Sequence, residues 1–281
     1  MRSCMTGKTV LITGASAGIG KATASELASR GARLVLACRD LEKAERARAE
    51  ILTRTPGAVV DLVPLELGSL RSVRACAMKL AADRARIDVL INNAGVFPAT
   101  LRFTEDGFEE QIGVNHLGHF LFTNLLVEKL VASAPARVVT VSSMMHAGGR
   151  IDFGSFRGPS KYSAYTAYRQ SKLANLLFAN ELARRLAGRG VTSNSLHPGG
   201  VATEIMRDTS FVLRALARLV FSSPEKGART PVYLASSPEV ASVTGRYFVG
   251  CKEAKTDPLA QDEALARALW DESSKLVGGL G

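Results

Sequence analysis

A tyrosine and a lysine stand four residues apart, at Tyr168 and Lys172, inside a long helical pattern over residues 167–186. Residues with this spacing lie one above the other on the same face of a helix. A phenol has an ordinary pKa of about 10, and a neighbouring ammonium favours its ionised form. The pair therefore predicts general acid–base chemistry, in which a proton moves to or from a carbonyl or alcohol oxygen near neutral pH.

A glycine-rich segment follows the first β-rich run and leads directly into a helical pattern. It reads Thr13-Gly14-Ala15-Ser16-Ala17-Gly18-Ile19-Gly20. The glycines allow a tight turn and let backbone N–H groups approach a pyrophosphate at the positive end of the helix. Because a strand precedes the segment and a helix follows it, the segment predicts dinucleotide binding. The binding residues expected here are Gly14, Ser16, Ala17, Gly18, Ile19 and Gly20.

Short β-rich runs alternate along the chain with longer helical patterns. The runs cover residues 10–13, 34–37, 59–65, 89–91, 138–142, 192–196 and 246–249, and the helical patterns between them include 21–30, 41–53, 70–85, 117–131 and 167–186. Most runs are continuous apolar stretches, which is typical of strands buried on both faces of a parallel sheet. The sequence therefore predicts one α/β domain over residues 1–281, a doubly wound (Rossmann-type) parallel sheet of about seven strands with helices on both faces.

Composition narrows the classes of protein. The 281 residues are 46% hydrophobic and 22% charged, which is typical of a globular domain. The excess of 36 basic over 26 acidic residues is mostly arginine spread along helices, and no basic run is interleaved with aromatic residues, so we expect no nucleic-acid partner. About eight residues precede the first strand and no run approaches the ~18 apolar residues of a membrane span. We expect a cytoplasmic protein without a transmembrane anchor, and peripheral membrane contact stays open.

The four cysteines carry no sign of a metal site or a disulfide. Cys4, Cys38, Cys76 and Cys251 form no C-x-x-C pair and have no histidine at metal-ligand spacing. They are interpreted as reduced thiols, and no metal is expected.

The spacing T-G-x-x-x-G-x-G in the glycine-rich segment is typical of the short-chain dehydrogenase/reductase family. Three further motifs resemble that family and occur in its order, over nearly the whole chain: Asn92-Asn93-Ala94-Gly95, Tyr168-Arg169-Gln170-Ser171-Lys172 and Pro198-Gly199-Gly200-Val201-Ala202-Thr203. The resemblance implies an oxidoreductase that moves a hydride between a nicotinamide and a substrate carbon while Tyr168 moves the proton.

The resemblance also assigns roles to single residues. In Val141-Ser142-Ser143, Ser143 would hydrogen-bond the substrate oxygen, with Ser142 as the alternative. Asn115 would hold a water in a proton relay behind Lys172, or would only bend its helix. Lys172 would also bind the nicotinamide ribose. The remaining cofactor contacts implied are Asn93, Ala94 and Gly95 on the adenosine side, and Pro198, Gly199, Val201 and Thr203 near the carboxamide and phosphate.

The end of the second β-rich run indicates which nicotinamide cofactor is bound. Cys38 stands where NAD-selective family members carry an aspartate, and Arg39 follows it. An arginine forms paired, charge-assisted bonds to a phosphate, so this arrangement favours NADP(H). The alternative is that Arg39 is solvated and Asp40 binds the ribose. Glu66-Leu67 takes the place of the family's Asp-Leu, whose aspartate lies near the adenine, so the resemblance implies that Glu66, one methylene longer, and Leu67 contact the cofactor.

Several stretches resemble the retinol dehydrogenase branch of the family, among them Ala37-Cys38-Arg39-Asp40, Val114-Asn115-His116-Leu117-Gly118-His119-Phe120 and Leu196-His197-Pro198-Gly199. The function expected is an NADP(H)-dependent oxidoreductase that interconverts an alcohol and a small apolar aldehyde or ketone, which is retinal-like, steroid-like or a secondary metabolite. The alternatives are a non-enzymatic NADP(H)-binding sensor and a family member with lyase or epimerase chemistry.

Two segments are expected to shape the substrate pocket. Ser143 and Tyr168 are 25 positions apart, longer than is common in the family, so residues 144–165 should form a wall of the cleft. His146 in this wall contacts substrate or has a local structural role. Residues 205–223 form a lid, a membrane-surface helix or an amphipathic helix packed on the core or another subunit. The family often pairs through the helices carrying Asn115 and Tyr168, so a homodimer or homotetramer is expected.

Overall fold

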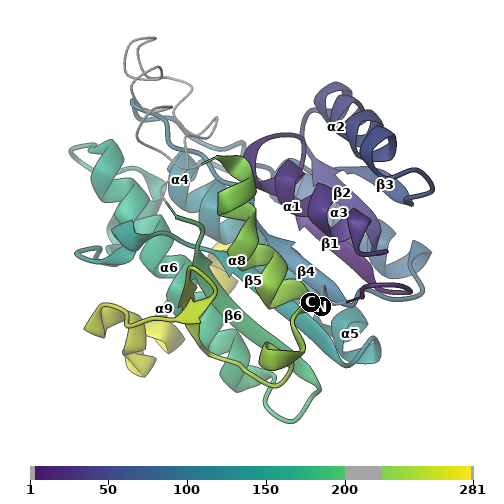
Figure 1. Cartoon of the computed structure of the whole chain (residues 1–281). Helices are drawn as coiled ribbons and strands as arrows, with labels where there is room; N and C mark the ends of the chain where they lie inside the picture. Colours follow the sequence, from purple (N-terminus) through teal and green to yellow (C-terminus); the bar gives the residue numbers. More distant parts are fainter. Residues whose placement is uncertain (1–3, 200–222, 280–281) are drawn as a thin grey trace.

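The computed structural model describes residues 4–199 and 223–279. Its centre is an eight-stranded sheet with the strand order β3-β2-β1-β4-β5-β6-β7-β8 (Figure 1). The strands are β1 (Thr9–Thr13), β2 (Arg33–Cys38), β3 (Val60–Pro64), β4 (Val89–Asn92), β5 (Ala136–Val141), β6 (Val191–His197), β7 (Tyr247–Val249) and β8 (Lys252–Glu253). The first seven are parallel and correspond to the seven predicted runs, whereas β8 pairs antiparallel with β7 and was not predicted.

Helices cover both faces of this sheet, as the doubly wound fold requires (Figure 1). The longer ones are α1 (Gly18–Ser29), α2 (Leu41–Arg54), α3 (Leu70–Asp83), α5 (His119–Ala132), α6 (Ala164–Arg185), α8 (Pro224–Ser236) and α9 (Glu263–Leu276). The shorter ones are α4 (Glu110–Ile112), the π-helix η1 (Gly113–Gly118), η2 (Met144–His146), η3 (Phe153–Arg157), η5 (Pro238–Val240) and η6 (Pro258–Gln261). Within residues 4–199 and 223–279, no helix is both long and apolar enough to span a membrane.

Alternate residues of each strand face opposite layers of the core. Val10 and Ile12 of β1 pack with α1, α2 and α8, whereas Leu11 between them packs with α3, α5 and α6. Burial on both faces explains why these strands read as continuous apolar runs. The strand order reverses between β1 and β4, and the carboxyl ends of parallel strands around such a reversal form the ligand crevice of this architecture.

Helix α6 is buried on nearly all sides because α9 packs against its outer face. The ring of Phe178 stacks on Trp270 with centroids 5.9 Å apart, and the guanidinium of Arg185 lies 4.3 Å from the centre of the same indole. The Asn180 side chain also donates to the carbonyl of Ala260, at 2.8 Å. The sequence patterns did not predict α9, although they predicted the helix that it covers.

Candidate active site

The glycine-rich segment forms a tight loop between β1 and α1. Gly14 has a φ of 66° and Gly18 one of 54°, in the left-handed region that favours glycine. A Cβ atom on Gly14 would lie 2.8 Å from Cβ of Ala94, and one on Gly20 would lie 2.5 Å from the carbonyl oxygen of Gly14. The loop therefore packs so closely on itself and on the Asn93–Ala94 loop that these two positions leave no room for a side chain.

Helix α1 differs from the other long helices of the described chain in how it begins. Side chains of Asp40, Ser69, Ser163, Ser223 and Asp262 accept a backbone N–H at the starts of α2, α3, α6, α8 and α9, whereas α1 follows Ala17 without a side-chain cap. Helix α5 also lacks a cap, but it continues from η1. The first-turn N–H groups of α1 are thus left for an anion at the positive end of the helix. This arrangement fits the pyrophosphate of a nicotinamide dinucleotide.

The loop after β4 is tied to the end of β1 by Thr13. Its Oγ1 accepts from the backbone N–H of Asn93, at 2.9 Å, and of Ala94, at 3.0 Å. The Asn93 side chain donates in return to the carbonyl of Thr13, at 2.8 Å. The predicted cofactor residues Asn93 and Ala94 therefore lie directly beside the predicted phosphate loop.

Arg39 and Glu66, at the ends of β2 and β3, lie next to each other. Their Nε and Oε2 atoms are 3.4 Å apart, and the Arg39 side chain is 64% exposed. The other oxygen of Glu66 accepts from the backbone N–H of Gly68, at 2.9 Å. Glu66 is thus oriented by the backbone and offers Arg39 an ionic partner. Leu67, in contrast, points its side chain into the hydrophobic core.

The two neighbours of Arg39 are engaged elsewhere. Cys38 is buried beside the phosphate loop; burial raises the pKa of its thiol, and hydrogen bonds from Ala15 and Ser16 oppose that rise. The Asp40 carboxylate accepts the backbone N–H of Lys43, at 3.0 Å, as the cap of α2. The Asp40 carboxylate is thus engaged as a helix cap, whereas the Arg39 side chain beside it stays exposed.

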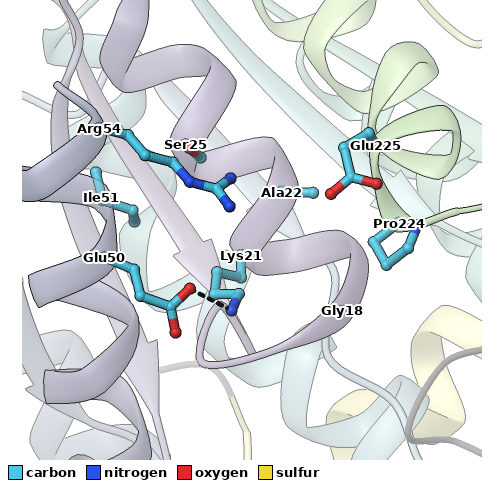
Figure 2. Close-up of a pocket in the computed structure, with 9 residues that line it drawn as sticks. All are labelled: Gly18, Lys21, Ala22, Ser25, Glu50, Ile51, Arg54, Pro224 and Glu225. Carbon is cyan, nitrogen blue, oxygen red and sulfur yellow. Dashed lines mark hydrogen bonds and ion pairs between the residues drawn. The ribbon is translucent and has the colours of Figure 1, made fainter.

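Lys21 is held by an ion pair with α2. Figure 2 shows its Nζ atom paired with Glu50 of α2, at 2.7 Å, on the wall of a hollow of about 210 Å³ between α1, α2 and the start of α8. Arg54 and Glu225 line the same hollow. This hollow contains none of the predicted catalytic side chains, and Lys21 is a surface helix residue.

Helix α6 holds Tyr168 and Lys172 behind the ends of β4 and β5. The Lys172 Nζ atom lies 5.4 Å from the centre of the Tyr168 ring and 3.4 Å from the carbonyl oxygen of Val141. A Cβ atom on Gly95 would lie 3.5 Å from that Nζ. Both side chains are buried, and the sequence-predicted pair therefore lies at the edge of the sheet where the cofactor loops meet.

Burial dominates the ionisation of this pair. It raises the pKa of Tyr168 to about 12, against an opposing hydrogen bond from Ser143, and it lowers the pKa of Lys172 to about 8. The sequence led us to expect that the ammonium would lower the pKa of the phenol. That expectation is wrong for the protein without a bound ligand, because removing both groups from water costs more than their separation of several ångströms returns.

The structure separates the two candidate serines. Ser142 is buried, and its hydroxyl donates to the backbone carbonyl of Lys172, at 2.7 Å. Ser143 is half-buried, hydrogen-bonds the phenol of Tyr168 and accepts from the backbone N–H of Met145, at 3.2 Å. Ser143 is thus the serine that lies beside the Tyr168 hydroxyl, and Ser142 holds α6 against β5.

Asn115 lies in the π-helix η1, fully buried beside the same site. Its Oδ1 accepts from the backbone N–H of Val96, at 2.7 Å, and its Nδ2 donates to the Val96 carbonyl and to Ser171 Oγ, at 3.1 and 3.0 Å. π-Helical turns are rare and often occur at functional sites. The side chain of Asn115 therefore joins the Asn93–Gly95 loop to α6, beyond any bend that it introduces.

Other predicted residues divide into two groups. Pro198 and Gly199 follow β6 and are half-buried, whereas Val201, Thr203 and residues 205–222 of the expected lid lie outside the described residues. Ser223 caps α8, and Pro224 stands in its first turn. In the expected wall, His146 has a structural role, because its Nδ1 meets the carbonyl of Ser143, at 2.7 Å, and its Nε2 accepts from the N–H of Asp257, at 3.2 Å.

Two further side chains at the site, Phe97 and His119, are not among the residues predicted from the sequence. The ring of Phe97 contacts Tyr168 edge-on, with centroids 5.1 Å apart. The imidazole of His119 lies between Thr13 Oγ1 and the carbonyl of Asn115. Phe97 gives no pattern that a sequence reveals, whereas the spacing of four between Asn115 and His119 on one helical run was a usable signal.

Comparison with known proteins agrees with this geometry. The short chain dehydrogenase family matches residues 8–211, and the chain belongs to that family. It is thus an oxidoreductase that uses a nicotinamide cofactor and a small-molecule substrate. Among its relatives, human retinol dehydrogenase 13 is 49% identical over 99% of this chain and 86% of its own length. Mouse retinol dehydrogenase 14 is 50% identical over 98% of this chain and 87% of its own.

Solved structures give the same fold. The crystal structure of an uncharacterised protein from Mycobacterium paratuberculosis has a TM-score of 0.79 and 39% identity, over 99% of this chain and 96% of that one. The RhlG/NADP active-site complex from Pseudomonas aeruginosa has a TM-score of 0.71 and 26% identity, over 87% of this chain and 95% of that one. The described fold, a doubly wound sheet extended by β8, is therefore that of the family.

Proposed function

We propose that this protein is an NADP(H)-dependent reductase of apolar aldehydes or ketones, with Tyr168 as the proton donor. The observation that carries the proposal is the buried Tyr168 phenol, hydrogen-bonded by Ser143 and followed one turn later by Lys172. The nicotinamide supplies the hydride when it is bound. Ser143 and Tyr168 would hold the carbonyl oxygen between two hydroxyl groups and stabilise the charge that develops on it.

The ionisation of the pair favours reduction over oxidation. Reduction needs a protonated phenol at the start, and burial keeps Tyr168 protonated because it raises the pKa to about 12. Lys172, with a pKa of about 8, is still mostly charged at pH 7 and favours the phenolate as the proton leaves. Alcohol oxidation would begin from the phenolate, which this buried site disfavours.

The preference for NADP(H) rests on Arg39. The β2 end carries no free carboxylate for a ribose, since Cys38 is a buried thiol and Asp40 caps α2. Arg39 is exposed and free to turn from Glu66 to a 2′-phosphate. Two structural neighbours support the same choice: the P. aeruginosa RhlG complex and an NAD(P)-dependent gluconate 5-dehydrogenase from Beutenbergia cavernae, both of which contain NADP.

An apolar substrate is supported by the side chains around the two hydroxyl groups. Phe97 packs against the Tyr168 ring, and Met144, directly after Ser143, is 60% exposed. Large apolar side chains left open beside a polar reacting pair are typical of a site for an apolar ligand with one polar end. The retinol dehydrogenase relatives are consistent with this class of substrate.

The test is NADPH oxidation, followed by absorbance, with a panel of retinal, a steroid ketone, an aliphatic aldehyde and a quinone. Tyr168→Phe should abolish turnover and leave NADPH binding within about twofold, because only the reacting hydroxyl is lost. Tyr165→Phe is the matched control, since it removes the hydroxyl of another tyrosine on α6, three residues earlier, and keeps the ring that packs on Phe97. Full activity of Tyr168→Phe would refute the mechanism.

Failure of the whole panel would favour one of the other readings. NADPH binding without turnover of any carbonyl would indicate a sensor. Conversion of a substrate without net NADPH consumption would indicate lyase or epimerase chemistry. A cytoplasmic location stays a prediction, and fractionation of cells that express the chain is its measurement.

We also propose self-association, as a homodimer or homotetramer, through α5 rather than α6. The outer face of α6 is covered by α9 within one chain, whereas α5 keeps half-buried Leu125, Val127 and Val131. Light scattering on the purified protein measures the assembly, and a monomer at all concentrations would contradict this proposal.

A further inference from the structure

We propose that His119 is a positioning residue that links the Thr13 end of β1, with the Asn93–Gly95 loop bound to it, to Asn115. It does so as a neutral imidazole protonated on Nδ1. The inference rests on the proposed function only for its kinetic consequences. His119 begins α5, directly after the π-helix that carries Asn115, and its side chain is 1% exposed.

The two contacts of the ring fix which nitrogen carries the proton. Nδ1 lies 3.1 Å from the carbonyl oxygen of Asn115, and a carbonyl can only accept, so Nδ1 donates. Nε2 lies 2.8 Å from Thr13 Oγ1 and therefore accepts the hydroxyl proton of Thr13. Burial lowers the pKa of His119 to about 4, so the ring is neutral at pH 7 and this arrangement is kept.

The hydrogen bond to His119 completes the set of partners around Thr13. Its hydroxyl proton goes to the imidazole, while the same oxygen accepts the backbone N–H groups of Asn93 and Ala94. The Ile91 carbonyl lies 3.5 Å from the same oxygen and is the more distant acceptor for its one proton, so the shorter contact to the imidazole, at 2.8 Å, is the main one. His119 thus orients the hydroxyl that holds the Asn93–Gly95 loop against the end of β1.

The π-helix explains why the carbonyl of Asn115 needs the imidazole. In a regular α-helix the backbone N–H of His119 would donate to that carbonyl, four residues earlier. Here the N–H of His119 donates instead to the carbonyl of His116. The ring Nδ1 of His119 reaches the carbonyl that its own backbone N–H does not, on the residue whose side chain bridges Val96 and Ser171.

One imidazole therefore holds two parts of the site in fixed relation. Its Nε2 contacts Thr13, where β1 ends and the phosphate loop begins. Its Nδ1 contacts Asn115 of η1, whose side chain hydrogen-bonds Ser171 of α6. Loss of the ring would leave the Thr13 hydroxyl with only the longer contact to the Ile91 carbonyl, and the Asn115 carbonyl without the imidazole donor, so the Asn93–Gly95 loop and η1 would no longer be held by one side chain.

The experiment compares His119→Leu with His116→Leu in the full chain. His116 is the matched control, because it is an equally buried neutral histidine in the same helical run, with Nε2 2.9 Å from Ser273 Oγ of α9. We expect both variants to lose stability in urea unfolding. His119→Leu should also raise the Kd for NADPH, measured by fluorescence titration, about tenfold. His116→Leu should leave that Kd within about twofold.

A third variant separates the contact of His119 with Thr13 from its contact with Asn115. Asn124 donates from its side chain to the carbonyl of Phe120, four residues earlier, at 2.7 Å, so His119→Asn should keep the contact to Asn115 and lose the one to Thr13. We expect His119→Leu to lower kcat as well, with any carbonyl that the wild type reduces, because the Asn115 contact is lost. His119→Asn should weaken NADPH binding as His119→Leu does, but should keep a kcat near that of the wild type. If His119→Asn restored NADPH affinity and kcat equally, or lost both equally, the two contacts would not have the separate effects proposed here.

Two results would overturn the coupling itself. One is an unchanged NADPH Kd in His119→Leu, and the other is the same loss of NADPH binding in His116→Leu. If His119→Leu does not fold, Thr13→Val removes the same hydrogen bond from the other end, and an unchanged Kd for NADPH in that variant overturns the proposal equally. Absence of any carbonyl reduction by the wild type would refute the proposed function alone, because the binding comparison needs no substrate.

Discussion

Replacement of Arg39 by alanine should remove the preference of the protein for NADPH over NADH. The guanidinium is 64% exposed, so its bond to a 2′-phosphate belongs at the weak end of charge-assisted hydrogen bonds, about 1.5 kcal/mol. Since 1.4 kcal/mol is a factor of ten, we expect the Kd for NADPH to rise about tenfold. NADH has no phosphate at this place, and its Kd should change less than about twofold.

Replacement of Glu66 should have the opposite effect and strengthen NADPH binding. Its carboxylate lies 3.4 Å from Arg39 Nε and competes with the phosphate for the guanidinium. An exposed pair of this kind contributes less than about 1 kcal/mol, so Glu66→Gln should tighten NADPH binding by at most about fivefold. Both effects should shrink as salt is raised from 0.05 to about 0.5 M, because exposed charges are screened.

The assay is fluorescence titration of NADPH and NADH on the same preparations. Asp40→Asn is the control, since asparagine also caps a helix and α2 should remain intact. Equal weakening of both cofactors by Arg39→Ala would refute the assignment. A selective loss of NADH binding in Asp40→Asn would show that Asp40, and not Arg39, meets the ribose.

Three further predictions concern the pair on α6 and the phosphate loop. Carbonyl reduction should fall as the pH rises through about 8, because Lys172 loses its charge there, and the pH–rate profile of Lys172→Arg should lack that step. At pH 7, the free energy of unfolding of Lys172→Met in urea should be up to ~3 kcal/mol higher than that of the wild type, because no charge is buried. Between pH 8 and 10.5 the unfolded wild type binds a proton that the folded wild type does not. The wild type therefore gains stability as the pH rises, and the difference should vanish across that range. Gly14→Ala should lose NADPH binding in titration and unfold more easily, because its φ of 66° and the Cβ of Ala94 oppose a side chain.

Each of these has a clear contrary result. A flat pH–rate profile from pH 7 to 9 in the wild type would show that Lys172 does not titrate in the step measured. A constant stability difference between Lys172→Met and the wild type over pH 7–10.5 would show that burial does not depress the pKa of the lysine. Wild-type NADPH affinity in Gly14→Ala would show that the loop has room to move.

Much of the fold could be predicted because parallel strands buried on both faces leave a plain signal. The seven runs and the helices between them occur where the apolar stretches and their spacing placed them, with ends shifted by a few residues. Strand β8 has two residues and no periodicity to detect. Helix α9 was missed because its amphipathic pattern follows a loop, without the strand alternation that revealed the others.

The residues of the site could be predicted from the sequence, whereas their pKa values could not. Tyr168, Lys172, Ser143 and Asn115 lie together as expected, because motifs at strand ends converge at one edge of a parallel sheet. The pKa values of the pair could not be predicted, since they depend on burial that no spacing expresses. The ion pair of Arg39 with Glu66 joins two strand ends, β2 and β3, whose side-chain contacts no motif describes.

The packing of α9 over α6 also sets an order for the making of the protein. Synthesis delivers N-terminal segments first, so β1 to α5, with the cofactor loops, can associate while later residues are still being added. Helix α6 is covered later, because Phe178 and Arg185 can contact Trp270 only after residues 258–276 have been synthesised. A ribosome that stalls before this point would present a nascent chain with its nucleotide loops formed and a wide apolar helix surface uncovered, which is a substrate for chaperones.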